Sequence, residues 1–357
     1  MFVALRDIRF ARGRFALMGA VVTLITTLVV FLYGLTGGLA SAASSAVDGL
    51  PADRIVFGAP AGAAPSASFS SSTISAGQQA GWAAAPGIRS VTPLGIALTR
   101  LTAQGSAASV SVLGTPSALL PPLLSGGPPQ DGQVAVGGDT AAADHLSVGS
   151  PVTVGARALT VSGITDDRSY QHAPTVWTTI ATWEAVSGQS RPTALAVGTG
   201  PGADLAAVDR AQNTAAVPRS DAPSAIDGYT AEQGSLQMIQ GFLFAVSALV
   251  VGAFFTVWTV QRRPDIAVLK AVGASSGYLV RDALAQAAAV LLAGALLGGA
   301  AGVVGGLIAS DGVPFDLSVS SVAVPVLAMV LLGLAGAALA VRRITSVDPI
   351  AALGANR

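Results

Sequence analysis

Four long runs without a charged side chain constrain the fold of this chain more than any other feature of its sequence. Each run exceeds the roughly 20 apolar residues that a helix needs to cross a bilayer core. Charged residues make up only 11% of the 357 residues, too small a share to cover a soluble fold of this size. We therefore expect four transmembrane helices, one within each of the runs Phe15–Val47, Gln233–Gln261, Ala283–Ser310 and Leu317–Val341.

The long block between the first and second runs has the composition of a folded domain. Its early part, Gly58–Gly77, is rich in Ala, Ser, Gly and Pro, which is typical of loops. Segments rich in β-branched residues predict strands at Ser90–Leu94, Ser109–Leu113, Gln133–Val136, Pro151–Val154, Ala158–Ile164 and Thr175–Ile180, with a hairpin around Gly155. Short helices are expected at Asp139–His145, Ala181–Ser187 and Ala203–Thr214. The pattern predicts an α+β domain.

The charged residues, all of which lie outside the four uncharged runs, are distributed unevenly along the chain. The N-terminal arm, the loop after the second run and the C-terminus hold eleven basic residues against four acids, whereas the other segments hold eight against fifteen. Because basic segments stay in the cytoplasm, the prediction is a polytopic α-helical membrane protein with four transmembrane helices and a large extracellular α+β domain between helices 1 and 2. The expected segments are an amphipathic cytoplasmic N-terminal helix (1–14), transmembrane helix 1 (15–47), the extracellular α+β domain (48–232), transmembrane helix 2 (233–261), a cytoplasmic loop with an amphipathic helix (262–282), transmembrane helix 3 (283–310), a short extracellular loop (311–316), transmembrane helix 4 (317–341) and a cytoplasmic C-terminus (342–357).

The N-terminus also fits a second interpretation. Arginines, an apolar run and the small residues of Leu39–Ala43 resemble a secretory signal peptide with its cleavage site. The uncharged run is long for the apolar region of such a signal, which favours a retained transmembrane helix.

Scarce residue types exclude several kinds of chemistry. The single lysine, Lys270, lies outside any G-x-x-x-x-G-K-[ST] motif, so the chain has no P-loop, and ATP hydrolysis is expected in a separate subunit. The absence of cysteine excludes disulfides, zinc thiolates and a cysteine nucleophile. Neither His145 nor His172 has the spacing of a zinc site or a catalytic triad. The sequence therefore predicts a protein that is not an enzyme.

The four runs themselves indicate how the membrane helices work. They contain no Asp, Glu, Lys, Arg or His side chain, which argues against ion-driven transport and favours an apolar or amphiphilic substrate, or none inside the membrane. Gly294, Gly298, Gly302 and Gly306 repeat every four residues on one face. Such a repeat predicts close packing against another helix, although the whole stretch is rich in glycine and alanine.

The loop after the second run predicts a short amphipathic helix. Pro264 and Asp265 suit the first turn of a helix, and Gly273 suits its end. Apolar residues fall on one face between them, which indicates either a helix that docks a cytosolic partner or an interfacial helix that contacts only lipid.

The whole chain resembles permease subunits of ABC exporters in the MacB/FtsX-like class. The loop from Arg263 to Ser275 is similar to the family's R-x-x-E-I-x-x-L-K-A-x-G-A-S pattern, with Asp265 in place of the usual Glu. The stretch from Arg342 to Leu353 resembles the closing pattern R-R-x-x-x-x-x-P-x-x-A-L, and Leu5–Arg9 resembles the basic helix before the first span.

This resemblance implies a homodimer in the bacterial cytoplasmic membrane, with both termini cytoplasmic and two copies of a cytosolic ABC ATPase that uses the ATP. It further implies mechanotransmission, in which closure of the ATPases moves the helices and the outer domain without an alternating-access tunnel. Contacts to membrane lipid are expected, and none to nucleic acid. The residues implied to couple to the ATPase are Pro264, Asp265, Ile266, Leu269, Lys270, Val272 and Gly273.

Within this class, Asp48–Gly58 and Gly163–Trp177 resemble the HrtB branch, the permeases of Gram-positive heme exporters. Heme is then expected as a transported substrate, with no permanently bound cofactor and no metal other than heme iron. Iron needs an axial His, Met, Tyr or carboxylate ligand, and Arg54 and Arg168 are suited to pair with the propionates. The candidate heme contacts are Asp48, Tyr229, Glu232, Met238, Tyr33, Tyr170 and His172, each of which also has a purely structural explanation.

Two other functions are compatible with the same membrane helices, outer domain and ATPase partner. An FtsX-like signalling permease would activate an extracellular cell-wall hydrolase and transport nothing. An exporter of another amphiphile, such as a peptide or lipid, would differ only in its substrate.

Overall fold

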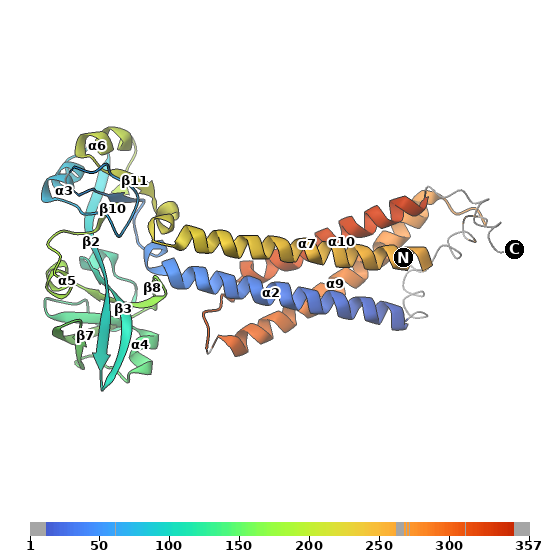
Figure 1. Cartoon of the computed structure of the whole chain (residues 1–357), viewed down its shortest axis with the longest axis horizontal. Coiled ribbons are helices and arrows are strands. Elements are labelled where there is room, and N and C mark those ends of the chain that lie inside the picture. Colours follow the sequence, from blue (N-terminus) through green and yellow to red (C-terminus); the bar gives the residue numbers. More distant parts are fainter. Residues whose placement is uncertain are drawn as a thin grey trace. The chain divides into compact units, whose positions relative to one another are not determined.

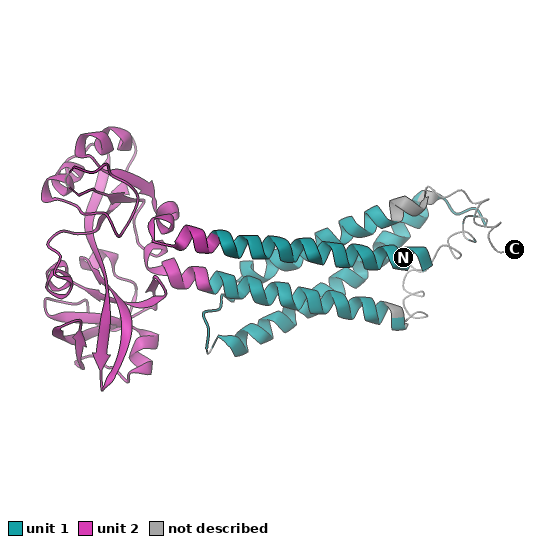
Figure 2. Cartoon of the chain, in the orientation of Figure 1, with its two compact units in different colours: residues 1–38, 234–357 teal, residues 39–233 magenta. Residues whose placement is uncertain are grey.

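The computed structural model describes residues 12–60, 62–261, 268, 270, 272–310 and 312–345. The chain divides into two compact units (Figures 1 and 2). Unit 1 comprises residues 1–38 and 234–357, and unit 2 comprises residues 39–233. Both boundaries fall inside helices, α2 (Arg12–Asp48) and α7 (Tyr229–Gln261), so each of these helices has one end in unit 2.

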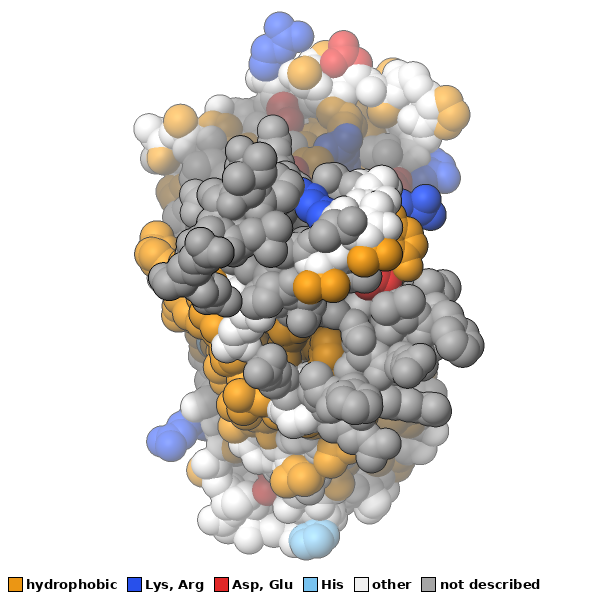
Figure 3. Space-filling view, turned by 90° about the vertical axis from the view of Figure 1, so that its right-hand side faces the viewer, with side chains coloured by type: hydrophobic (Ala, Val, Ile, Leu, Met, Phe, Trp, Pro, Cys, Tyr) orange, Lys and Arg blue, Asp and Glu red, His pale blue; other side chains and the backbone are white. Residues whose placement is uncertain are grey.

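Unit 1 is built from long apolar helices. Besides α2 and α7 it contains α9 (Ser276–Ala309) and α10 (Val319–Thr345). Ser275 caps α9, because its hydroxyl accepts a hydrogen bond from the backbone N–H of Tyr278. Each of these four helices is long and apolar enough to cross a membrane, which confirms the four predicted spans. Figure 3 shows hydrophobic side chains (orange) in the middle of the view, with few charged ones among them.

The predicted glycine stripe of α9 packs against α2. A Cβ atom on Gly298 would lie 2.6 Å from the carbonyl oxygen of Thr23, closer than real Cβ atoms approach. Cβ atoms on Gly294 and Gly302 would lie 2.8 and 2.7 Å from Cγ1 of Val22 and Val30. Close backbone approach therefore requires glycine here, and the expectation of tight packing is confirmed.

The segment between α9 and α10 packs against the same face of α2. The backbone N–H of Asp316 donates to the carbonyl of Gly34 at 2.9 Å, and the Phe315 ring contacts that of Phe31 with centroids 5.2 Å apart. Burial would raise the pKa of the Asp316 carboxyl, but hydrogen bonds from Ser321 and Ser318 hold this pKa below its usual value.

Unit 2 is an α+β domain, as predicted. Its elements are β1 (Arg54–Phe57), α3 (Ala76–Ala83), β2 (Ile88–Ala103), β3 (Ser106–Gly114), η1 (Ser117–Leu119), β4 (Leu123–Gly126), β5 (Gln133–Gly137), α4 (Gly138–Ala143), β6 (Pro151–Val154), β7 (Arg157–Thr165), β8 (Ser169–Tyr170), β9 (Ala173–Thr178), α5 (Ile180–Ser187), β10 (Ala194–Thr199), α6 (Leu205–Gln212), β11 (Ala215–Pro218) and η2 (Arg219–Ala225). The predicted hairpin around Gly155 joins β6 to β7, and Gly155 has a φ of +59°.

Six strands of unit 2 close into a ring. The ladders run from β2 through β3, β9, β5, β7 and β6 and return to β2. Alternate side chains point inward, as the pleat of a strand requires, and fill the interior with aliphatic residues. This core includes Leu101, Val110, Val112, Val134, Val136, Val154, Val161 and Val176.

A second, antiparallel sheet uses the other half of β2. Its order is β11-β1-β10-β2, and the register of β2 with β10 runs from Ile88 to Leu94. One face of this sheet packs against Trp82 of α3, whose indole N–H donates to the hydroxyl of Thr214 at 3.0 Å. The other side faces a core that also includes Val47 and Leu50 from the α2 end of the unit.

Candidate functional site

The candidate residues of unit 2 gather around a tight turn between β8 and β9. Ser169 and Tyr170 pair with Pro174 and Ala173, so Gln171 and His172 form a two-residue hairpin turn. Their φ values are 50° and 60°, in the left-handed region that such turns require and that Asn-Gly normally occupies. For residues with larger side chains this conformation costs about 1–3 kcal/mol each, and the surrounding structure must hold it in place.

The end of α2 holds this turn through backbone hydrogen bonds. The N–H of Gln171 donates to the carbonyl of Ala43 at 2.9 Å, and the N–H of His172 donates to that of Ala42 at 3.0 Å. Two positions before the turn, the N–H of Ser169 donates to the Ser45 hydroxyl at 2.9 Å. The backbone of the turn is therefore bonded directly to the last turns of α2.

The first turn of α7 meets the same hairpin through a side-chain pair. Nε2 of His172 lies 3.1 Å from Oε2 of Glu232, and the two side chains are 41% and 30% exposed. A carboxylate in the first turn of a helix interacts favourably with the positive end of the helix dipole. Of the seven candidate heme contacts, His172 and Glu232 are a pair that the structure brings into direct contact.

Asp48 is the last residue of α2, and its backbone carbonyl contacts a basic side chain. Its carboxylate accepts a hydrogen bond from the Ser44 hydroxyl at 2.7 Å, and its backbone carbonyl accepts one from the guanidinium of Arg219. Nε of Arg168 lies 2.9 Å from the position that a Cβ atom on Gly49 would take. Cations stabilise the negative end of a helix, so Arg219, which donates to the last carbonyl of α2, complements this helix end.

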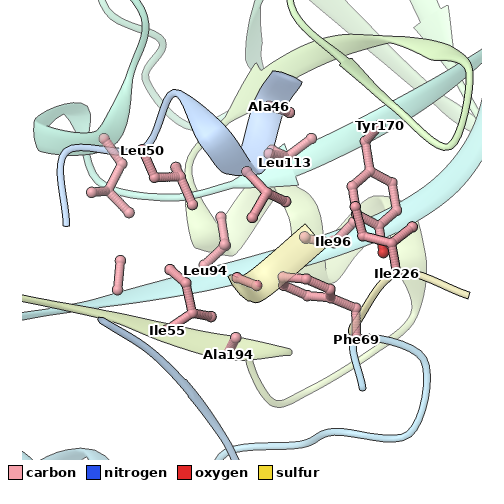
Figure 4. Packing of buried hydrophobic residues seen from close by; sticks show 14 of the residues in the cluster. Ala46, Leu50, Ile55, Phe69, Leu94, Ile96, Leu113, Tyr170, Ala194 and Ile226 are labelled. Carbon is pink, nitrogen blue, oxygen red and sulfur yellow. The ribbon is translucent and has the colours of Figure 1, made fainter. Parts of the chain in front are cut away.

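The tyrosines of unit 2 belong to its core. Tyr170 is 4% exposed, and its ring meets that of Phe69 edge-on with centroids 5.8 Å apart. Figure 4 shows the Tyr170 ring among the labelled core residues, near Ile226. Burial raises the pKa of the Tyr170 hydroxyl, which keeps it neutral. Tyr229 is partly buried against the same cluster. Tyr170 is therefore inaccessible to a bulky ligand in this conformation.

Two candidate heme contacts lie in unit 1. The Met238 side chain on α7 is 64% exposed. Tyr33 on α2 is half-buried, and its carbonyl accepts a hydrogen bond from the Thr36 hydroxyl at 3.0 Å. Thr36 in turn accepts a hydrogen bond from the side-chain amide of Gln240, which links α2 to α7.

Part of the predicted coupling segment can be placed. Pro264, Asp265, Ile266 and Leu269 lie outside the described residues. Among the others, Val268 and Val272 are 63% and 84% exposed. The N–H of Gly273 donates to the carbonyl of Lys270 at 3.0 Å, and Gly273 has a φ of +104°, as expected for a residue that ends a helical turn.

The sequence did not predict the residues whose hydrogen bonds hold this site together. Arg219 was not a candidate, and the contacts of Ser45 with the hairpin join segments far apart in the chain. No local signal marks the hairpin turn, because Gln171 and His172 replace the usual asparagine and glycine, and the preceding residues 166–170 include no β-branched side chain. Among the described residues, no three His, Asp or Glu side chains are placed to hold a metal ion together.

Two family models match the chain. Residues 15–215 match the MacB-like periplasmic core domain, and residues 238–349 match the C-terminal region of FtsX-like permeases. The chain is a MacB/FtsX-like ABC transporter permease. As a member of this family the permease works with an ATPase partner, and its four apolar helices make it a multi-pass membrane protein.

Individual relatives of the permease extend over its full length. A putative hemin transport system permease, HrtB of Staphylococcus haemolyticus, is 27% identical over 362 residues, which are 99% of each chain. An uncharacterized ABC transporter permease of Mycobacterium bovis is 27% identical over 371 residues, also 99% of each chain. The crystal structure of the periplasmic region of MacB from Actinobacillus actinomycetemcomitans covers 51% of the permease and 96% of that chain, with a TM-score of 0.37 and 13% identity.

Proposed function

We propose that this permease exports heme, as a homodimer driven by two copies of a separate ATPase. The observation that carries the proposal is its full-length similarity to HrtB hemin transport permeases of two Staphylococcus species, at 23–27% identity. The uncharged membrane runs support an apolar substrate over an ion. Heme, a flat apolar ring with two propionates, fits this requirement.

The proposed orientation follows the charge asymmetry of the sequence. Both termini and the loop at 262–282 lie in the cytoplasm, and unit 2 lies outside the cytoplasmic membrane. In this orientation the ATPase meets the loop at 262–282, and force generated there passes along the helices to unit 2. The partner subunit hydrolyses ATP, whereas the permease changes conformation and provides the surface that binds the substrate.

The proposed heme contacts in unit 2 are those candidate residues whose side chains a ligand can reach. Asp48, Glu232 and His172 can each offer an axial ligand to iron, and Tyr229 lines the adjoining core surface. Arg168 and Arg219 beside Asp48 are suited to pair with the propionates. Tyr170 is left out because its ring is buried. In unit 1, Met238 and Tyr33 remain separate candidates, to be tested one by one.

Heme binding gives the direct test of this proposal. Purified permease is expected to shift the Soret band of added heme, and Asp48→Ala or Met238→Ala should weaken binding by at least about tenfold, a typical loss when the coordination shell of a metal is disturbed. Glu184→Ala on α5 removes a carboxylate outside the candidate group and should bind heme normally. Absence of any Soret shift in a dimer that couples to its ATPase would refute heme as the substrate and favour signalling or another amphiphile.

Docking of the ATPase is proposed to use the segment from Pro264 to Ser275. Val268 and Val272 are one helical turn apart and both largely exposed, which suits burial against a protein partner. The positive φ of Gly273 excludes most larger side chains at the end of this turn.

A substitution in this segment should therefore uncouple the two subunits. Val272→Asp or Gly273→Trp is expected to abolish stimulation of the ATPase and its co-purification with the permease, because a charge or a bulky ring prevents close docking. Val313→Asp places the same charge on an exposed apolar residue in the segment between α9 and α10 and should leave association intact. If the Val272 and Gly273 variants still stimulated the ATPase fully, docking through this segment would be refuted.

A further inference from the structure

The β8–β9 turn is bonded to two helices at once. Its backbone N–H groups donate to carbonyls of α2 at residues 42 and 43, and the His172 side chain contacts Glu232 of α7 at 3.1 Å. The two carbonyls lie inside α2, and a carbonyl oxygen has two lone pairs. The turn can therefore bond to them without breaking the hydrogen bonds of the helix.

The conformation of the turn depends on these bonds. Gln171 and His172 both have positive φ values, 50° and 60°, although neither is glycine. Conformations of this kind persist only where the surrounding structure holds them. Separation of α2 from α7 would remove part of that support, so the state of the turn and the spacing of the two helix ends are coupled.

The turn leads directly into the middle of the closed ring of strands. β9 begins at Ala173, immediately after the turn, and pairs with both β3 and β5. The carbonyl of Tyr170 accepts a hydrogen bond from the Ser111 hydroxyl of β3 at 2.9 Å. A displacement of the turn is therefore transmitted to strands in the interior of unit 2 and not to a peripheral loop.

We propose that the β8–β9 turn is a clasp that ties the ends of α2 and α7 to the ring of strands. The clasp is closed in the present structure and opens, with loss of the contact between His172 and Glu232, when ATPase turnover changes the spacing of the two helix ends. This inference rests on the proposed function only in that an ATPase moves the helices; it requires no particular substrate. It assigns a mechanical role to two residues that the sequence suggested as candidate heme contacts.

The permease itself has no cysteine. In a crosslinking test on the full permease–ATPase complex, the complex with unmodified permease, treated with the same reagent, therefore reports any effect of the reagent on the ATPase alone. In the His172→Cys/Glu232→Cys variant, a short bifunctional methanethiosulfonate reagent should bridge the two positions and lock the clasp. Because opening of the clasp is a required conformational step, locking should lower ATPase activity of the complex by about tenfold. Reduction of the bridge with dithiothreitol should restore the activity.

A second cysteine pair tests whether a crosslink elsewhere in unit 2 changes ATPase activity. The side-chain amide of Gln78 on α3 lies 3.2 Å from the carbonyl oxygen of Asn213, away from both α2 and α7. The Gln78→Cys/Asn213→Cys variant should crosslink with no change in ATPase activity.

The possible results separate the clasp from the choice of substrate. Efficient bridging of positions 172 and 232 with unchanged ATPase activity would overturn the clasp, and failure to bridge them in the folded complex would refute the contact itself. ATPase activity is measured here without heme, so a permease that binds no heme would still support the clasp if locking it stopped turnover.

Discussion

Replacing Gly298 by valine is expected to disrupt the packing of α9 on α2 and to leave little folded permease in the membrane. The first added carbon would lie 2.6 Å from the Thr23 carbonyl and 2.7 Å from Cβ of Thr26, and the backbone of α2 cannot move away locally. Overpacking against backbone is expected to cost at least about 3 kcal/mol. Thermal unfolding of the detergent-purified protein, together with its yield from membranes, measures the effect.

Two other glycines provide controls for this result. Gly241 on α7 has open space where a Cβ would be placed, and Gly305 on α9 would make ordinary contact with the Phe31 ring at 3.4 Å. Gly241→Val and Gly305→Ala should therefore unfold close to the temperature of the unmodified protein. A Gly298→Val protein as stable as these two would show that the glycine stripe does not set the distance between α2 and α9.

Truncating Trp183 to alanine is expected to destabilise unit 2 by about 3–5 kcal/mol. Trp183 on α5 is fully buried, and its ring lies over Gly95 of β2 and Gly114 of β3, which are partners in the strand register. The two glycines leave room for the indole, so removing the ring creates a cavity that the strands cannot fill. Chemical denaturation followed by the fluorescence of the remaining tryptophans gives the change in the free energy of unfolding.

A double-mutant cycle tests the cause of this loss. Gly95→Ala alone should also destabilise the domain, because its Cβ would overlap the indole, but it should cost far less in the Trp183→Ala background, where the ring is gone. Leu98→Ala on β2, at a side chain that is 55% exposed, should have little effect. Additive effects of Gly95→Ala and Trp183→Ala would contradict the packing described here.

Features that depend on local sequence were predicted well. The uncharged runs predict the membrane helices because a bilayer requires length and apolarity from consecutive residues. The spacing of Gly294, Gly298 and Gly302 predicts a closely packed face because this face repeats every four residues. The β6–β7 hairpin was predicted from one glycine between two β-branched segments. In each example the physical requirement is met by neighbours in the chain.

Features that depend on distant partners were missed. The predicted strand Ser90–Leu94 ends too early, since β2 runs to Ala103 and changes its partner from β10 to β3 near Gly95. Short strands such as Arg54–Phe57 give too weak a pattern to be distinguished from a loop. The contact between His172 and Glu232 joins residues 60 positions apart, and no local pattern indicates it. The burial of Tyr170 likewise follows from packing alone.

The sharing of β2 has a consequence for how unit 2 unfolds. One half of this strand supports the closed ring of strands and the other half supports the antiparallel sheet, so three hydrophobic cores share a single backbone segment. No core can lose its part of β2 without exposing amide groups next to another. The domain therefore has the architecture of one cooperative folding unit with several cores, in which local opening at either end propagates through the same strand.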